Sequence, residues 1–137
     1  MKVRFDTSQL TAYAGKLTAA IVKVRPEKVT KHYGTILVAR TRAKASGRPG
    51  PNAPTGRYRN SIKVRYETDM ATGASMAIVY SEEPQSFRLE LGFKGVDSLG
   101  RHYNQPPFPH FSTALADTER LFAGAAERLA IDAVPLP

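Results

Sequence analysis

The sequence predicts an α+β domain in which helices cover one face of a small antiparallel sheet. Apolar residues recur at helical spacing in the first third of the chain and again near its C-terminus. Between these regions, short stretches alternate apolar and polar residues with the period of two that is typical of strands. Pro- and Gly-rich segments separate the periodic stretches. At 137 residues the chain suits a single domain, 1–137, with flexible loops at about 43–57 and 92–109.

The helical periodicity predicts an N-terminal helix pair, or one long kinked helix, and a C-terminal helix. Good N-cap residues precede an apolar stripe over 7–24. Pro26 then ends that helix or begins the next one, which continues to about Lys44. A last stripe predicts a helix over 110–131 that packs on the sheet. Residues 2–5 alternate weakly, which is compatible with a short strand.

The strand periodicity predicts a β-meander of three to four strands. Alternating residues indicate strands over 62–68, 76–80 and 87–91. Turn residues, with a Gly in the first connection and a Pro in the second, separate them. Antiparallel hairpins are the economical arrangement, and the helices are the obvious cover for one face of the sheet.

Charge is distributed unevenly along the chain, which carries a net +8. Residues 1–68 hold 15 Lys and Arg against 3 Asp and Glu, whereas residues 69–137 hold 5 against 9. Such polarisation suits a phosphate-bearing partner, or copies of the chain that pack basic side against acidic side. A solvated basic surface without a partner is the alternative interpretation.

The first long loop is the predicted contact segment, because cationic side chains gather around it. The predicted subunit or partner contacts are Arg48, Pro49, Pro51, Pro54, Thr55, Arg57 and Tyr58. The candidate DNA backbone contacts are Arg40, Arg42, Lys44, Arg57 and Arg59. No helix-turn-helix, zinc-finger or RNA-binding signature accompanies them, so such contacts would carry no sequence information.

Residue patterns that support catalysis or cofactor binding are sparse. The histidines His32, His102 and His110 are scattered, without the spacing that places two on one metal. The Gly-rich loop fails the P-loop pattern, because Arg57 follows Gly56 where Lys is required. The chain has no Cys and no run of about 18 apolar residues. We therefore expect a soluble protein without a signal peptide, catalytic site, cofactor, metal or membrane partner.

Three segments in series resemble the neck proteins of long-tailed bacteriophages, the head–tail joining or tail completion proteins of siphophages. Ala53–Ile62 (APTGRYRNSI) is similar to the family's aPxxTGxLrxSI pattern before the first strand. Leu89–Phe93 (LELGF) resembles its vEfGt strand end. Gln105–Phe111 (QPPFPHF), which leads into the predicted terminal helix, resembles its PaRPFlrpAl segment.

This resemblance implies an α+β fold, no enzymatic activity and a structural role in the virion, after synthesis in the host cytoplasm. It implies a homo-oligomeric ring around the DNA channel, with a hexamer favoured over a dodecamer. The implied neighbours are the head-closure protein and the tail-terminator or tail-tube protein. A tail terminator ring is one alternative. A basic module that binds nucleic acid without sequence specificity is another.

Overall fold

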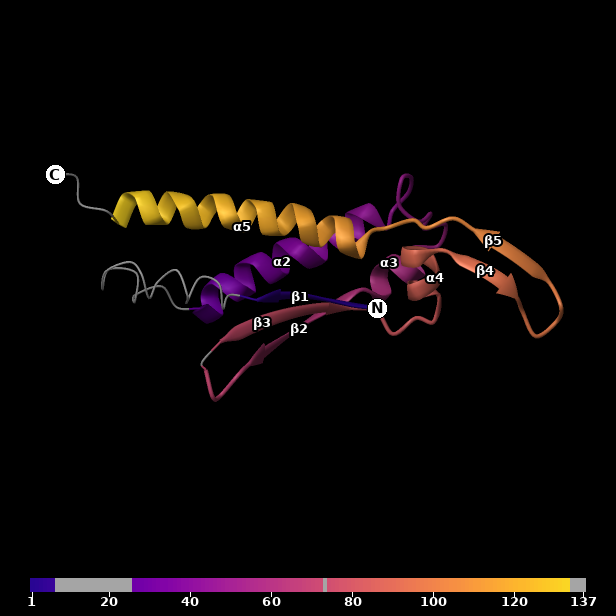
Figure 1. Ribbon diagram of the computed structural model, residues 1–137, viewed down its shortest axis with the longest axis horizontal. Helices are drawn as coiled ribbons and strands as arrows, with labels where there is room; N and C mark the ends of the chain where they lie inside the picture. Colours follow the sequence, from indigo (N-terminus) through magenta and orange to yellow (C-terminus); the bar gives the residue numbers. More distant parts are fainter. Residues whose placement is uncertain (7–25, 73, 134–137) are drawn as a thin grey trace.

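The computed structural model describes residues 1–6, 26–72 and 74–133, and these residues form an α+β fold (Figure 1). The predicted helix over 7–24 lies outside them. In chain order the elements are β1 (Lys2–Asp6), α2 (Pro26–Lys44), α3 (Arg57–Ser61), β2 (Lys63–Thr68), β3 (Ser75–Tyr80), α4 (Gln85–Leu91), β4 (Phe93–Val96), β5 (His102–Gln105) and α5 (Phe111–Ala133). No helix within the described ranges is long and apolar enough to cross a membrane.

The larger sheet has the strand order β1-β3-β2, and both pairings are antiparallel. Val79 of the central strand β3 lies opposite Val3 on one side and Val64 on the other. The predicted hairpin over 62–68 and 76–80 is therefore confirmed. The sheet is not a meander, however, because its third strand is the N-terminal β1, which pairs with the far edge of β3.

The predicted strand over 87–91 is wrong, because these residues belong to helix α4. The buried residues of α4 are Ser86 and Glu90, which are four positions apart. Phe87 and Leu91, also four apart, are exposed. Five alternating residues fit a strand and a short helix equally well, and the tertiary contacts of Glu90 select the helix.

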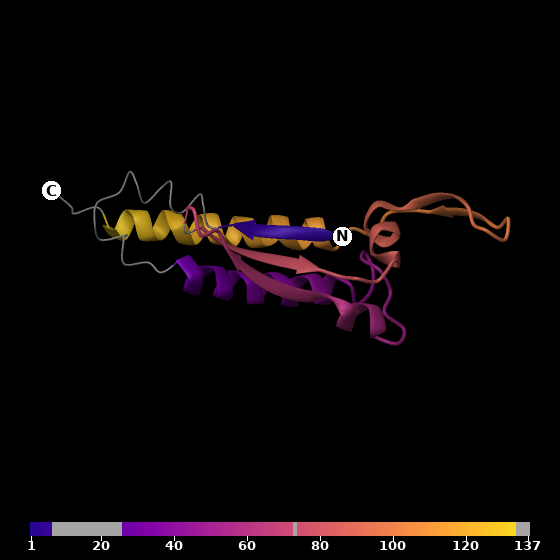
Figure 2. The same cartoon turned by 90° about the horizontal axis from the view of Figure 1, so that it is seen from below.

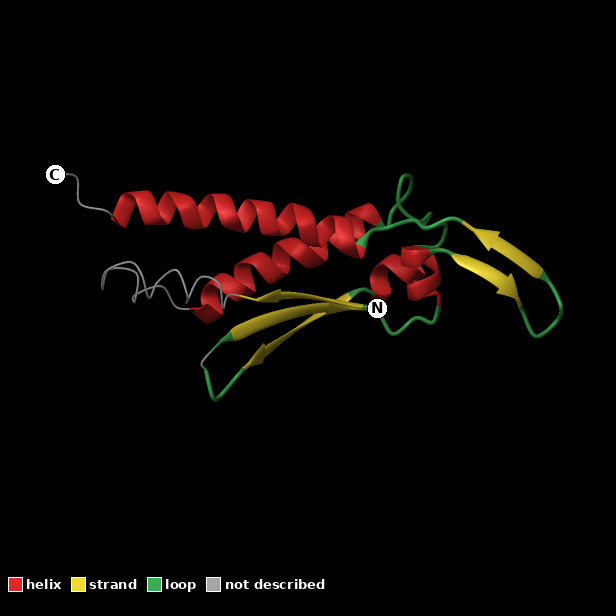
Figure 3. Ribbon diagram, in the orientation of Figure 1, coloured by secondary structure: helices red, strands yellow, loops and turns green. Residues whose placement is uncertain are grey.

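The predicted long loop over 92–109 is also wrong in part, because it contains the antiparallel hairpin β4–β5. In Figure 3 this hairpin extends away from the rest of the molecule. The first predicted loop remains a loop as far as Gly56, and α3 then separates it from β2. Strand β2 therefore begins at Lys63, one residue later than the sequence predicts.

The helices α2 and α5 lie side by side on the same face of the larger sheet (Figures 1 and 2). Between α2 and α5, Lys44 pairs with Asp117 at 2.9 Å, and the Tyr33 and Phe122 rings meet edge to face. The helix predicted to begin at Pro26 and the terminal helix are both confirmed.

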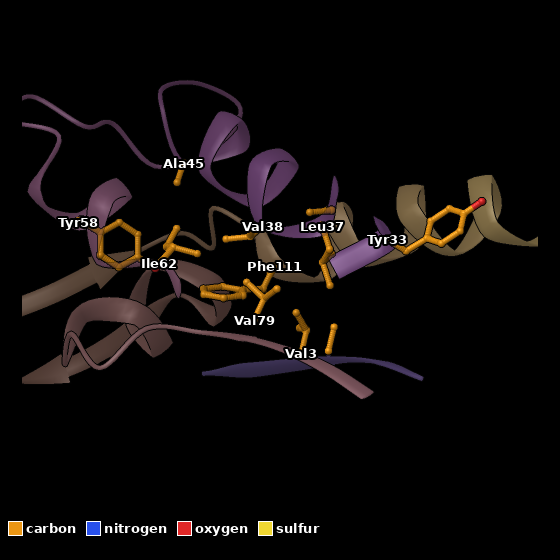
Figure 4. Close-up of a cluster of buried hydrophobic side chains, with 11 residues drawn as sticks. Val3, Tyr33, Leu37, Val38, Ala45, Tyr58, Ile62, Val79 and Phe111 are labelled. Atoms are coloured by element: carbon orange, nitrogen blue, oxygen red, sulfur yellow. The ribbon is translucent and has the colours of Figure 1, made fainter. Parts of the chain in front are cut away.

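The core lies between the helices and the sheet, where Leu37, Ile62, Val79 and Phe111 are buried (Figure 4). Gly34 is the weakest helix former in the middle of α2, and it faces this interface. A Cβ at Gly34 would lie 2.8 Å from the Cβ of Ala77 and 2.8 Å from the ring of Tyr66. Glycine is therefore required there because the helix approaches the sheet too closely for a side chain.

Candidate functional site

The start of α5 is held by a carboxylate from α4. His110 is the N-cap of α5, since its carbonyl accepts the first helical hydrogen bond, from Ala114. Glu90 Oε2 accepts hydrogen bonds from the backbone N–H groups of His110 (2.8 Å) and Phe111 (3.0 Å), and Oε1 accepts one from Ser112 (2.9 Å). One side chain thus satisfies three of the N–H groups that a helix N-terminus leaves without partners.

The imidazole of His110 joins the same cluster, which we call the junction (Tyr58, Glu90 and His110). His110 Nδ1 lies 2.9 Å from the Phe108 carbonyl oxygen and 3.1 Å from Glu90 Oε2. Both neighbours are acceptors, so Nδ1 carries the hydrogen. The Tyr58 hydroxyl lies 2.6 Å from Nε2 and donates to it when the ring is neutral. The junction therefore connects α3, α4 and α5.

The environment of the junction shifts two pKa values in opposite directions. Burial alone would raise the pKa of Glu90, but the hydrogen bonds from His110 and Ser112 outweigh it and hold this pKa well below its usual range. Burial raises the pKa of Tyr58 to about 12, although a hydrogen bond with Ser86 opposes the shift and the nearby Glu90 charge adds to it. At neutral pH the junction holds an anionic Glu90 and a neutral Tyr58.

The hydrogen-bonding groups of the junction are buried and have partners within the chain. The side chains of Glu90 and His110 are 1% and 0% exposed. In the part of the chain that the structure describes, no buried side-chain N or O atom lacks a hydrogen-bond partner. A substrate needs access and an unoccupied polar group, and the junction offers neither. Its geometry is that of a structural joint.

The predicted contact loop packs against the segment that leads into the junction. The guanidinium carbon of Arg48 lies 3.9 Å from the centre of the Phe108 ring. A Cβ at Gly50 would lie 1.8 Å from the Lys44 carbonyl oxygen, so only glycine fits there. Pro51 is also buried in this packing. The loop is thus attached to the body at its centre.

Two residues of the predicted contact set, Tyr58 and Pro51, are buried within the chain. Tyr58 is buried because its hydroxyl completes the junction. The exposed members of that set are Arg48, Pro49, Pro54, Thr55 and Arg57.

The candidate DNA-binding cations are largely engaged within the chain. Arg42 donates two hydrogen bonds to the Ile62 carbonyl oxygen, at 3.0 and 2.7 Å. Lys44 pairs with Asp117 on α5, and Arg57 lies 3.6 Å from Glu83. The remaining two, Arg40 and Arg59, are half-buried. The structure thus gives Arg42, Lys44 and Arg57 partners within the chain that the charge pattern alone does not indicate.

Helix α4 and the β4–β5 hairpin carry exposed apolar side chains, and we call these two elements together the hairpin surface. Its side chains lie on more than one face, because Val96 is opposite His102 and Tyr103 is opposite Gly95, which places Val96 and Tyr103 on opposite sides of the hairpin. Most of the large apolar side chains that are exposed in the described residues lie on it. Its members are Phe87, Leu91, Val96, Leu99 and Tyr103. Since soluble proteins rarely gather exposed apolar side chains without a partner, this surface is a candidate contact region.

The tip of the hairpin is held rigidly by Asp97. One carboxylate oxygen accepts hydrogen bonds from the backbone N–H groups of Leu99 and Arg101, each at 2.9 Å. The other accepts from the Arg101 guanidinium at 2.7 Å and the Tyr103 hydroxyl at 3.2 Å. These bonds hold the pKa of Asp97 below its usual range, with the backbone N–H of Arg101 the largest cause. An organised tip suits a preformed contact element.

The sequence interpretation missed the junction, although two signals for it were present. Pro109 and His110 precede the terminal helix where Ser, Thr, Asp or Asn is the usual N-cap. A helix that begins without such a residue needs a cap from elsewhere. Glu90, a lone carboxylate between Leu89 and Leu91, is a suitable acceptor for the N–H groups of that helix start, but a separation of 20 positions along the chain conceals the pairing.

Comparisons with known proteins provide no relative for this chain. No protein-family model, curated protein or solved structure matches it.

Proposed function

We propose that this chain is a structural subunit of the neck of a long-tailed bacteriophage, where identical copies form a ring around the DNA channel between head and tail. The observation that carries the proposal is the hairpin surface, where α4 and the projecting β4–β5 hairpin present exposed large apolar side chains (Figure 3). A ring needs such an element, because one face of each copy must contact a different face of the next.

The placement of the resembling segments supports the same proposal. The segment before β2 supplies Tyr58, the segment around the end of α4 supplies Glu90, and the segment before α5 supplies His110. The three short patterns that resemble phage neck proteins therefore meet at one junction. Residues that act together in the fold are expected to occur together in a family, even when each pattern alone is short.

The proposal is tested by measuring the mass of the purified protein by light scattering, alone and mixed with tails extracted from virions. We expect a ring, with six copies favoured, in at least one of the two conditions. Leu99→Asp places a charge on the hairpin surface and should abolish the ring-sized species. Met70→Asp is the matched control, since Met70 is exposed at the β2–β3 turn, far from the hairpin along the sequence.

Two outcomes would contradict the proposal. One is a monomer at every concentration that also fails to associate with tails. The other is equal loss of assembly in the Leu99→Asp and Met70→Asp proteins, which would show that the hairpin surface has no particular part in assembly. A ring that binds tails but not heads would identify the chain as a tail terminator instead.

A further inference from the structure

The two faces of the larger sheet differ in chemistry. Alternation along the strands places Val3, Val64 and Val79 toward the helices, where they join or pack against the core. The residues between them point to the opposite face. This second face, which we call the open face, has neither α2 nor α5 packed on it (Figure 2).

The register arranges cations of the open face in two rows. Lys2 of β1 and Lys63 of β2 both lie opposite Tyr80 of the central strand. In the next row, Arg4 and Arg65 both lie opposite Ile78. All four cationic residues are exposed. Each row therefore has a positive residue on each edge strand and an apolar or aromatic residue between them. Ile78 is only 2% exposed, so the accessible part of this face is formed by the cationic side chains and not by the centre of β3.

The third row limits the basic area to one end of the sheet. Asp6 and Glu67 occupy it, opposite Met76. Glu67 also lies 3.1 Å from Arg65, whose guanidinium is within 5.5 Å of the Tyr80 ring centre. The basic area is thus formed by Lys2, Arg4, Lys63 and Arg65, and it lies at the end of the sheet next to α3.

From this arrangement we propose that the open face binds the phosphate backbone of DNA through Lys2, Arg4, Lys63 and Arg65. Edge strands of a three-stranded sheet are about 10 Å apart, and successive rows on one face are about 7 Å apart. Four cations in so small an area match a partner of high linear charge density. DNA is such a partner, with one negative charge per about 1.7 Å of helix axis.

The density of the four charges favours a phosphate backbone, although these side chains can bind carboxylate and phosphate oxygens alike. Guanidinium groups present a planar fork that suits two phosphate oxygens, and Lys serves as a point charge. Contacts between these four side chains and the phosphate backbone carry no sequence information. The binding surface is distinct from the hairpin surface, so it can be tested whether or not the chain forms a ring.

The test measures binding of a fluorescent random 20-base-pair duplex at several salt concentrations. The variant Lys2→Gln/Lys63→Gln removes two charges from the open face. The matched control Lys28→Gln/Lys31→Gln removes two exposed charges from α2, away from this face. We expect the open-face variant to bind more than about tenfold more weakly, with a log–log salt slope shallower by about 2, because each phosphate contact contributes about 0.9. The control should keep the wild-type slope.

Three outcomes would overturn the proposal. The first is no binding of the duplex by the wild-type protein at 50 mM salt, and the second is equal weakening in both variants, which would reflect net charge alone. The third is displacement of the duplex by poly-glutamate at equal charge concentration, which would assign the face to an acidic protein. Equal thermal unfolding midpoints of the two variants establish that lost binding is not lost folding.

Discussion

Helix α4 separates two regions that use their side chains in opposite ways. On its inner side, the charged Glu90 is 3% exposed and belongs to the junction. On its outer side, the next residue, Leu91, is 65% exposed and belongs to the hairpin surface. The usual arrangement of a surface helix, apolar inward and charged outward, is reversed at these two positions.

The two regions also differ in whether their side chains find partners within the chain. A buried carboxylate is tolerated only when its charge is compensated, and here three helix N–H groups and an imidazole compensate it. The junction is therefore complete within one chain. The hairpin surface leaves large apolar side chains in water, and a lone two-stranded hairpin has little stability of its own. It is the region to which our proposal assigns the contact with another copy of the chain.

The largest expected effect comes from a substitution that breaks the junction. Glu90→Ala removes the acceptor of three backbone N–H groups and leaves them buried at the start of α5. We expect the free energy of unfolding to fall by about 3–5 kcal/mol, as when one partner of a buried charged pair is removed. Urea denaturation measures this change. The control Glu82→Ala removes an exposed carboxylate of the same type and should alter stability by less than about 0.5 kcal/mol.

The pH dependence of stability tests whether Glu90 is ionised in the junction. The folded-state pKa of Glu90 lies below its ordinary value of 4.5, so the unfolded chain takes up this proton first as the pH falls. The stabilisation by Glu90 is therefore full above that value and is lost toward lower pH. Between pH 5.5 and 3, urea denaturation should show a steeper loss of stability for wild type than for Glu90→Gln. Parallel curves would contradict an ionised Glu90 in the fold.

The sequence predicts the elements whose periodicity is long or whose boundaries carry strong signals. The helix α2 begins at Pro26, which suits a first turn, and an apolar stripe runs from Val29 to Val38 within its 19 residues. The hairpin β2–β3 is predicted because two stretches of alternating apolar and polar residues are joined by turn residues. The strand predicted where α4 lies is wrong because seven residues make less than two full helical turns. That is too few to distinguish the helical period from the strand period.

The junction and the projecting hairpin depend on contacts that a linear pattern does not contain. Strand β5 (His102–Gln105) has the sequence HYNQ, in which Tyr103 stands alone among polar residues, and β4 includes Gly95, so neither strand shows a clear alternation. Their pairing comes from the turn that Asp97 organises. The position of Glu90 beneath α5 likewise depends on a hydrogen bond across 20 residues. Tertiary contacts, and not local preference, determine both regions.

The smallest expected effect on global stability is at the hairpin tip, and it sharpens the contrast with the junction. Asp97→Ala removes the acceptor of four hydrogen bonds, the same kind of loss as Glu90→Ala. The hairpin projects from the core, so its opening need not unfold the domain. Amide hydrogen exchange in β4 and β5 should therefore accelerate while exchange in α2 and β3 stays unchanged. Faster exchange throughout would mean that the hairpin is part of the cooperative core, and the two regions would then differ in exposure but not in their contribution to folding.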